Sequence, residues 1–247
     1  MNDTTVPGLP LAAPLYKSMK RRLTDALTRG EWKPGEAIPA ERRLSERFGI
    51  SVGTVRKAVD ELVAENILIR QQGRGTFVAT HNRDREVFYF FHVVPERGPR
   101  EYPDVQLQSF GRGRADRTVA ELLGIGPGDP VFRVRNLLSL GSAPIIVDDI
   151  TLPAARFAGL TERQFRARRS TIYNLYQDAF GTSVVKTRER LRATEADAAS
   201  GALLNVEPGT PLLQIRRVAL SYRDAPVEYR MSLVNTAGHE YWAEIGA

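Results

Sequence analysis

The chain has 247 residues, of which 42% are hydrophobic and 26% are charged, a composition typical of a globular protein. With about 150 residues for an average domain, this length predicts two unequal domains. The chain has no cysteine, which excludes disulfides, thiolate nucleophiles and cysteine-based metal sites. Its three histidines lie far apart in sequence and outside any metal-binding motif. We therefore expect no catalytic residue, no cofactor and no metal site.

The net charge of +6 is concentrated in the first third of the chain. Residues 1–79 carry 13 lysines and arginines against 9 aspartates and glutamates. This excess favours contact with nucleic acid, although a solvated charged surface is the alternative interpretation. The longest apolar run, residues 87–94, is far shorter than the roughly 20 residues of a membrane span. Without a visible targeting segment, the expected location is cytoplasmic, with no membrane contact.

Three helices are expected between residues 14 and 64. Leucine or methionine recurs every fourth residue from Leu15 to Leu27, which predicts one apolar helix face. A short helix is predicted over residues 40–48, and Gly49 provides a tight exit from it. Ser51 is a suitable N-cap for a third helix. Two helices joined by such a short, glycine-containing turn match a helix-turn-helix, whose second helix reads the major groove of DNA.

A β-hairpin is expected directly after the third helix. Residues 67–69 and 76–78 have the composition of short strands, and residues 71–75 form a basic, glycine-rich turn between them. Beside a helix-turn-helix, such a hairpin is a wing. Arg74 at its tip is placed to reach the minor groove or the backbone of DNA.

Residues 14–78 resemble the winged-helix domain of the GntR family of bacterial transcription regulators. The matching segments are Leu15-Tyr16, Pro34-Gly35, Glu41-Arg42-Arg43-Leu44, Phe48-Gly49, Thr54-Val55-Arg56-Lys57-Ala58 and Gly73-Arg74-Gly75-Thr76-Phe77-Val78. Many members carry arginine where this chain has Val52. The resemblance, with the motif positions, implies DNA contacts from Arg42, Ser51, Gly53, Thr54, Arg56, Lys57, Gln72, Gly73 and Arg74.

The remainder of the chain contains an internal repeat. We expect an N-terminal arm over residues 1–13, a winged helix over 14–79, a linker over 80–86 and a second domain over 87–247, whose first strand is 87–94. Residues 122–135 align with residues 203–216, and each copy continues into a strand, a turn and another strand. Two such hairpins predict one twisted antiparallel sheet. Helices near residues 153–165, 171–180 and 194–203 are expected to cover one side of it.

Arg133 and Arg135 alternate along a predicted strand, so their side chains lie on the same face. Two adjacent guanidiniums repel each other unless they are hydrated or surround an anion. The second copy of the repeat has Gln214 and Arg216 at the matching positions. This asymmetry favours a single anion pocket, with a wet surface or a subunit contact as the alternative.

Residues 87–247 resemble the effector-binding UTRA domain of the HutC subfamily, which is related in fold to chorismate lyase. The matching segments are residues 122–130, the arginine pair at 133 and 135, residues 171–173, residues 203–211 and residues 226–229. In this family a small metabolite binds between the two halves of the domain. The resemblance implies an effector site at Arg133, Arg135, Asp148, Ser170, Thr171, Tyr173 and Glu228.

The sequence therefore indicates an α+β protein, in which a winged helix-turn-helix precedes a chorismate-lyase-like domain with a mostly antiparallel sheet. The leading functional hypothesis is a transcription regulator, expected to act as a repressor. In it a homodimer binds a palindromic double-stranded DNA operator, and a small anionic metabolite in the second domain shifts the relative position of the two DNA-binding domains. Candidate effectors are an amino-sugar phosphate, a urocanate-like acid, a phosphonate and another carboxylate. The alternatives are an enzyme of chorismate-lyase type and a non-specific DNA-binding protein.

Overall fold

The computed structural model describes residues 14–82, 89–168 and 170–243, and the chain divides into two compact units, Met1–Ala79 and Thr80–Ala247. The expected arm over residues 1–13 and most of the expected linker lie outside the described residues. None of the described helices is both long enough and apolar enough to span a bilayer.

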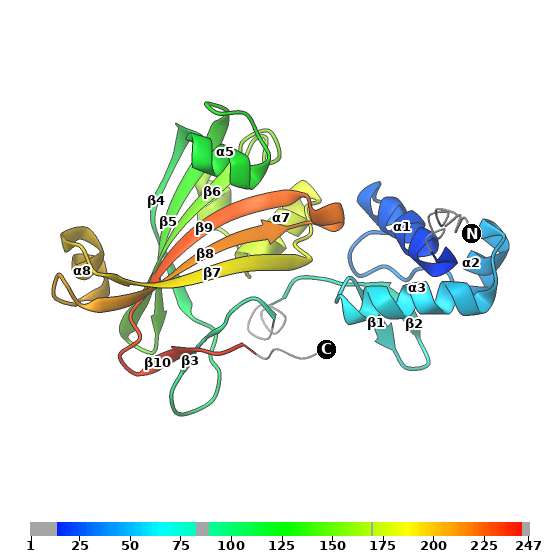
Figure 1. Cartoon of the computed structure of the whole chain (residues 1–247), viewed down its shortest axis with the longest axis horizontal. Helices are drawn as coiled ribbons and strands as arrows, with labels where there is room; N and C mark the ends of the chain where they lie inside the picture. Colours follow the sequence, from blue (N-terminus) through cyan, green and yellow to red (C-terminus); the bar gives the residue numbers. More distant parts are fainter. Residues whose placement is uncertain (1–13, 83–88, 169, 244–247) are drawn as a thin grey trace, which may run out of the picture. The chain divides into compact units, whose positions relative to one another are not determined.

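The first unit is three helices followed by a hairpin (Figure 1). Its elements are α1 (Leu15–Thr28), α2 (Glu41–Phe48), α3 (Val52–Ala64), β1 (Leu68–Gln71) and β2 (Gly75–Val78). The core contains Met19, Leu23, Leu44 and Val55, none more than 1% exposed. Leu15 was expected on the apolar face, but as the first residue of α1 it is 70% exposed.

The turn between α2 and α3 is formed by local interactions. Gly49 ends α2 in the left-handed conformation, with a φ of 65°. The Ser45 hydroxyl donates to the carbonyl of Ile50 at 2.5 Å, and the Thr54 amide donates to the Ser51 side chain at 3.2 Å. Because these residues lie close together in the chain, the signals for this turn are local in the sequence. The expected helix-turn-helix and wing are confirmed.

The second unit is built on a six-stranded antiparallel sheet with the order β4-β5-β6-β9-β8-β7. The strands are β4 (Asp104–Arg114), β5 (Pro130–Leu140), β6 (Ala143–Pro153), β7 (Lys186–Glu195), β8 (Pro211–Leu220) and β9 (Pro226–Val234), and a short 3₁₀ helix, η1 (Tyr222–Asp224), joins β8 to β9. The two copies of the repeat form the two halves of this sheet. They meet at β6 and β9, so the expected single twisted sheet is confirmed.

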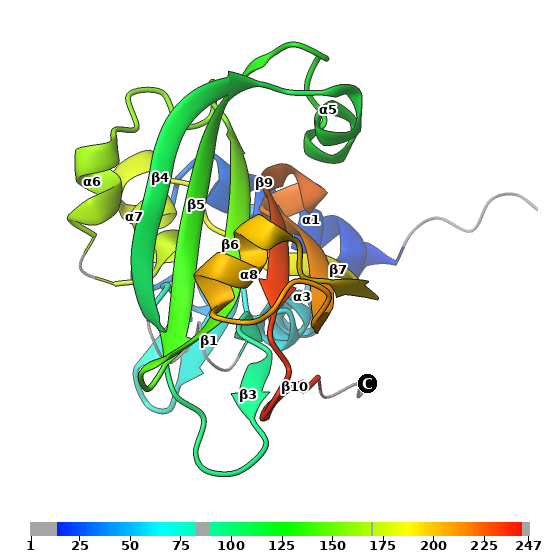
Figure 2. The same cartoon turned by 90° about the vertical axis from the view of Figure 1, so that its left-hand side faces the viewer.

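Helices cover both faces of the sheet, whereas one face was expected (Figure 2). On the first face, face A, α6 (Glu162–Arg166) and α7 (Ile172–Phe180) pack on residues such as Phe132 and Ile150. On the opposite face, face B, α5 (Arg117–Leu123) packs on Val131, and α8 (Ala198–Leu204) packs on Val147. The helix that follows β4 and the helix that follows β7 are equivalent in the repeat, which explains why both lie on face B.

A small second sheet pairs β3 (Val93–Pro95) with β10 (His239–Tyr241). The expected strand over residues 87–94 is therefore wrong for most of its described part, because residues 89–92 form no strand. Phe90 is buried in the core, and its carbonyl accepts a hydrogen bond from the Arg217 guanidinium. The Arg217 side chain thus occupies the Phe90 carbonyl, which in a strand would accept from the backbone of a neighbouring strand.

A buried ion pair fastens this small sheet to the large one. Arg217 on β8 donates to Glu189 on β7, and the Tyr241 hydroxyl on β10 donates to the same carboxylate. The Arg217 and Glu189 side chains are each 9% exposed. Burial opposes the negative charge of Glu189, but Arg217 and Tyr241 outweigh it and hold the pKa of Glu189 below its ordinary value.

We predict that Glu189→Gln destabilises the second unit by about 3–5 kcal/mol at neutral pH, because it leaves the Arg217 charge buried without a counter-charge. A lowered pKa in the folded state means that the contribution of Glu189 is complete above a pH of about 4.5 and is lost as the pH falls further. The variant should therefore lose less stability than the parent between neutral and acidic pH. Urea unfolding as a function of pH measures both effects. Glu195→Gln, an exposed change on the same strand, is the control, and equal losses in the two variants would contradict the prediction.

Candidate nucleic-acid interface and ligand pocket

The residues expected to contact DNA lie on the surface of the first unit, at the start of α2, the first two turns of α3 and the hairpin tip. All of them are exposed except Thr54, which is half-buried. They are Arg42, Ser51, Gly53, Thr54, Arg56, Lys57, Gln72, Gly73 and Arg74. At the tip, Gly73 has a φ of 70° and Gly75 a φ of 119°, so the tight turn uses glycine where other residues would be strained.

Glu41 joins three of the elements that carry these residues. Its carboxylate accepts from Arg56 Nε on α3 at 2.8 Å and from Arg70 Nη2 on β1 at 3.1 Å. Arg70 also pairs with Asp60 at 2.6 Å. The start of α2, the exposed face of α3 and the base of the wing therefore adjoin one another. The sequence analysis missed Arg70, for which the only signal was a basic residue next to the glycine-rich turn.

Two of the residues expected to contact DNA have their charged groups close to aromatic rings. The Lys57 ammonium lies 4.2 Å from the centre of the Tyr16 ring on α1, so this side chain is turned toward α1. The Arg74 guanidinium lies 5.8 Å from the ring of Phe77 within the wing. Arg42 is extended, with its side chain 88% exposed and a 3.4 Å contact to Glu46.

In the second unit, the residues expected to form one effector site lie on opposite faces of the sheet. Asn136 pairs with Asp148 across β5 and β6, which places the even-numbered positions of β5 on face A with Asp148. Arg133 and Arg135 have odd numbers and lie on face B. Glu228, on β9, is in the core of face A, where the hydroxyls of Tyr173 and Tyr176 contact it. The structure therefore does not bring these residues into a single site, since side chains alternate along a strand.

Thr171 and Ser170 lie at the start of α7 on face A. Thr171 is buried, and its side chain caps the helix by accepting from the Asn174 amide at 3.1 Å. Ser170 is half-buried directly before it. Asp148, Thr171, Tyr173 and Glu228 thus come together on face A.

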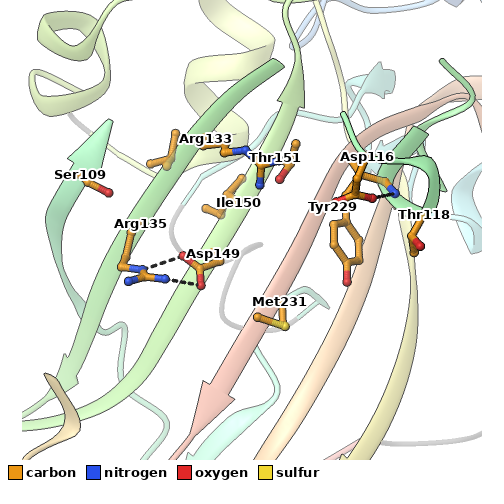
Figure 3. Close-up of a pocket in the computed structure, with 12 residues that line it drawn as sticks. Ser109, Asp116, Thr118, Arg133, Arg135, Asp149, Ile150, Thr151, Tyr229 and Met231 are labelled. Carbon is orange, nitrogen blue, oxygen red and sulfur yellow. Dashed lines mark hydrogen bonds and ion pairs between the residues drawn. The ribbon is translucent and has the colours of Figure 1, made fainter. Parts of the chain in front are cut away.

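The arginine pair lines an open groove of about 510 Å³ on face B (Figure 3). Arg135 makes a two-pronged ion pair with Asp149, with N–O distances of 2.7 and 2.8 Å, which raises the pKa of Arg135. Arg133 donates to the carbonyl of Arg114 at 3.0 Å. Because Asp149 already neutralises Arg135, an anion in this groove competes with a carboxylate held in place by the sheet.

A buried charge network lies at the centre of face A. Arg230 donates to Glu228 at 2.9 Å and to Asp148 at 3.0 Å, and Ser232 donates to Asp148 at 2.5 Å. We define the buried charge network as these four residues together with Tyr173 and Tyr176. Burial opposes the charge of Arg230, but Glu228 and Asp148 outweigh it and raise its pKa well above the ordinary value. Burial, reinforced by Glu228, likewise raises the pKa of Tyr176.

Two small cavities, of about 40 and 20 Å³, adjoin the buried charge network. Both are lined by Phe91, Leu138, Asp148, Arg217 and Arg230. We call these cavities and the residues that line them the face A pocket. Each has room for about one or two water molecules, so in this conformation the pocket is almost closed.

Several polar groups of the residues that line the face A pocket can form further hydrogen bonds or ion pairs. Within the described residues, Arg230 Nη2 and Asn136 Oδ1 are buried and have no hydrogen-bond partner. Arg168, which lines the larger cavity, donates to the carbonyl of Phe165 at 2.6 Å but forms no ion pair with any described carboxylate. Burial lowers the pKa of Arg168. The pocket thus offers two guanidinium groups and one carbonyl acceptor to a ligand.

Sequence reasoning missed Arg168, Arg217, Arg230 and Asn136. A signal for two of them was present. Arg217 on β8 and Arg230 on β9 lie two residues from buried positions of the same strand, so their side chains lie on the same face as those buried residues. A charged residue at a core position requires a buried partner, and this points to a network. The signal for Arg168 was absent, because it lies in the irregular segment between α6 and α7.

Comparison with known proteins agrees with this architecture. Residues 15–78 match the model of the bacterial regulatory proteins of the gntR family, and residues 100–239 match the UTRA domain. The histidine utilization repressor of Pseudomonas aeruginosa is 30% identical over 89% of this chain and 86% of its own length. The mannosyl-D-glycerate transport/metabolism system repressor of Escherichia coli is 27% identical over 92% of this chain and 94% of its own length.

Solved structures of regulators are also similar to this chain. The ligand-binding domain of a GntR-family regulator from Bordetella bronchiseptica covers 64% of this chain and 99% of its own, with 33% identity and a TM-score of 0.61. PhnF from Mycobacterium smegmatis covers 93% of this chain and 99% of its own, with 25% identity and a TM-score of 0.55. The family and these relatives are transcription regulators and not enzymes. The winged helix, the antiparallel sheet and both family matches establish that this chain belongs to the GntR family of bacterial transcription regulators, in the group that carries a UTRA effector-binding domain.

Proposed function

We propose that the protein is a repressor that binds a palindromic operator as a homodimer and responds to a small anion bound in the face A pocket. The observation that supports an anionic ligand is the buried Arg230, which lines the pocket beside Arg168 and whose Nη2 has no hydrogen-bond partner among the described residues. An anion there completes the hydrogen bonding of one guanidinium and supplies the other with a counter-charge.

The DNA-binding part of the proposal follows from the exposed start of α3. In a helix-turn-helix this segment enters the major groove, and a dimer places two such helices about one helical turn apart, so that the operator mirrors the twofold symmetry. The test is binding of the purified protein, near physiological salt, to DNA from upstream of its own gene and to scrambled DNA. A preference of about a thousandfold supports a specific regulator, and equal affinities would support non-specific binding instead. Sedimentation of the complex gives the number of protomers.

Arg56 is the side chain whose contact with DNA can be tested most directly by mutation. It extends from α3 with 62% of its side chain exposed, and its single described ion pair, to Glu41, is one that a base or phosphate can replace. We predict that Arg56→Ala weakens operator binding by about 1–3 kcal/mol and lowers the preference over scrambled DNA. Fluorescence anisotropy with both DNAs measures this. Arg117→Ala, which removes an exposed arginine with a similar ion pair on α5, is the control. Equal affinity of Arg56→Ala and the parent would refute the contact.

The effector part of the proposal assigns a role to each free group of the face A pocket. The anionic group of the ligand accepts from Arg230 and Arg168, and an N–H or O–H group of the ligand donates to Asn136 Oδ1. Phe91, Tyr102 and the other apolar lining residues pack on its body. The relatives are named for histidine and for mannosyl-D-glycerate, two unlike compounds, so the effector of this chain follows from its own pocket.

Two arginine variants distinguish the two faces. We predict that Arg168→Gln weakens the anion response about tenfold or more, since it removes one of two charge-assisted contacts. Arg133→Ala on face B should leave the response unchanged. The measurement is release of operator DNA by urocanate, glucosamine 6-phosphate, methylphosphonate and inorganic phosphate, each titrated against the parent and both variants. Loss of the response in Arg133→Ala alone would place the effector on face B.

A further inference from the structure

His81 holds the segment that leads from the DNA-binding unit firmly to α7. It is 4% exposed and lies two residues beyond the end of the first unit. Its backbone N–H donates to Gln177 Oε1 at 3.0 Å, and its carbonyl accepts from Asn174 Nδ2 at 3.2 Å. Its ring nitrogen Nε2 accepts from the Val184 amide at 3.2 Å. Backbone and side chain are thus both fixed, by α7 and by the segment that follows it.

The ring of His81 also touches the buried charge network. Its centre lies 5.7 Å from that of Tyr173 and 5.7 Å from that of Phe90, and these two rings pack edge to face at 5.2 Å. The Tyr173 hydroxyl contacts Glu228 at 3.4 Å, and the Arg230 guanidinium lies 5.7 Å from the Tyr173 ring. Two contacts therefore separate Arg230 in the face A pocket from His81, and both pass through Tyr173.

Two other surface features lack contacts of this kind. In the groove on face B, Asp149 already pairs with Arg135 and Arg133 donates to the Arg114 carbonyl, and nothing in the described residues points to a particular occupant. The exposed arginines of β7 line an open surface, and within the part of the chain that the structure describes they have no buried partner that would indicate a bound group. The contacts of His81, by contrast, connect the pocket to the chain segment that must transmit a response.

We infer that His81 is the positioning residue that couples the face A pocket to the DNA-binding unit. The inference rests on the proposed function, since it assigns the route by which occupancy of that pocket alters operator binding. An anion on Arg230 weakens the hold of Arg230 on Glu228 and Asp148. Glu228 and Tyr173 then adjust together, and the ring of His81 moves with Tyr173. Because the His81 backbone is bonded to α7, the start of the second unit follows.

A double-mutant cycle tests this coupling without any ligand. Asp148→Asn keeps the shape of the side chain and removes one of the two charges that hold Arg230, so it perturbs the network as an effector would. We expect it to change operator affinity about fivefold or more in the parent background. In the His81→Ala background the same change should alter affinity by less than about twofold, because the contact with Tyr173 is gone. Operator affinity is measured by fluorescence anisotropy on the full chain.

The controls separate coupling from a loss of folding. Thr80→Ala alters the exposed neighbour of His81, and in that background Asp148→Asn should act as it does in the parent. Thermal unfolding of each variant shows that it is folded. If His81→Ala does not fold, the half-buried Asn174→Ala replaces it, because it removes the bond to the His81 carbonyl and leaves the ring in place.

The results of the double-mutant cycle can be told apart from a failure of the proposed function. An equal effect of Asp148→Asn in both backgrounds, or no effect in the parent, would overturn the role of His81. A cycle that shows coupling in a protein that no anion releases from DNA would support His81 and overturn the anionic effector alone. Failure of the parent to prefer its operator would overturn the proposed function and this inference together.

Discussion

The burial of Arg230 between Asp148 and Glu228 is the interaction on which the second unit depends most. Burying a charge carries a large desolvation penalty, which only close, well-oriented partners offset. Asp148 is on β6 and Arg230 on β9, so their 3.0 Å contact joins the two halves of the internal repeat where they meet. Tyr176 donates to Glu228 at 2.7 Å and thereby seats α7 on the same group of charges. The sheet, α7 and the face A pocket therefore share one set of hydrogen bonds. A change in the geometry of one of them alters the contacts of the other two.

Charge serves a different purpose in the DNA-binding unit. Glu41 pairs with Arg56 and Arg70, but all three side chains remain partly exposed, at 24%, 62% and 46%. Such surface pairs contribute little to stability, about 0–1 kcal/mol each. Under the proposed function, they hold the arginines near their working positions while leaving them free to exchange Glu41 for a phosphate or a base. Exposed pairs suit a surface that must change partners, whereas the buried charge network suits a core that must respond as a unit.

The sequence predicted those parts of the fold whose signals are local. Gly49 and Ser51 mark the turn of the helix-turn-helix, and the repeat around residues 122–135 and 203–216 predicted a sheet of two related halves. The ligand site was harder to predict, because a strand presents alternate residues to opposite faces and an error of one position moves a side chain to the other side. Arg133 and Arg135 were grouped with Asp148 by the resemblance to the UTRA domain, and not by working out which face of the sheet each side chain occupies. The irregular backbone at Phe90 depends on Arg217, 127 residues away, and no local pattern reports such a contact.

Under the proposed function, the face A pocket separates recognition from response. Arg168 and Asn136 line the pocket, but no ion pair or side-chain hydrogen bond ties them to the buried charge network among the described residues, so a change at either position alters which ligand fits without disturbing the sheet. Arg230 belongs to both sets, since two of its nitrogens bind carboxylates, the third has no partner among the described residues, and the residue lines the cavity. A ligand that binds only Arg168 and Asn136 therefore gains affinity but leaves the network as it was. Only a ligand that reaches Arg230 can favour one arrangement of the network over another, and this difference in affinity is what allostery requires.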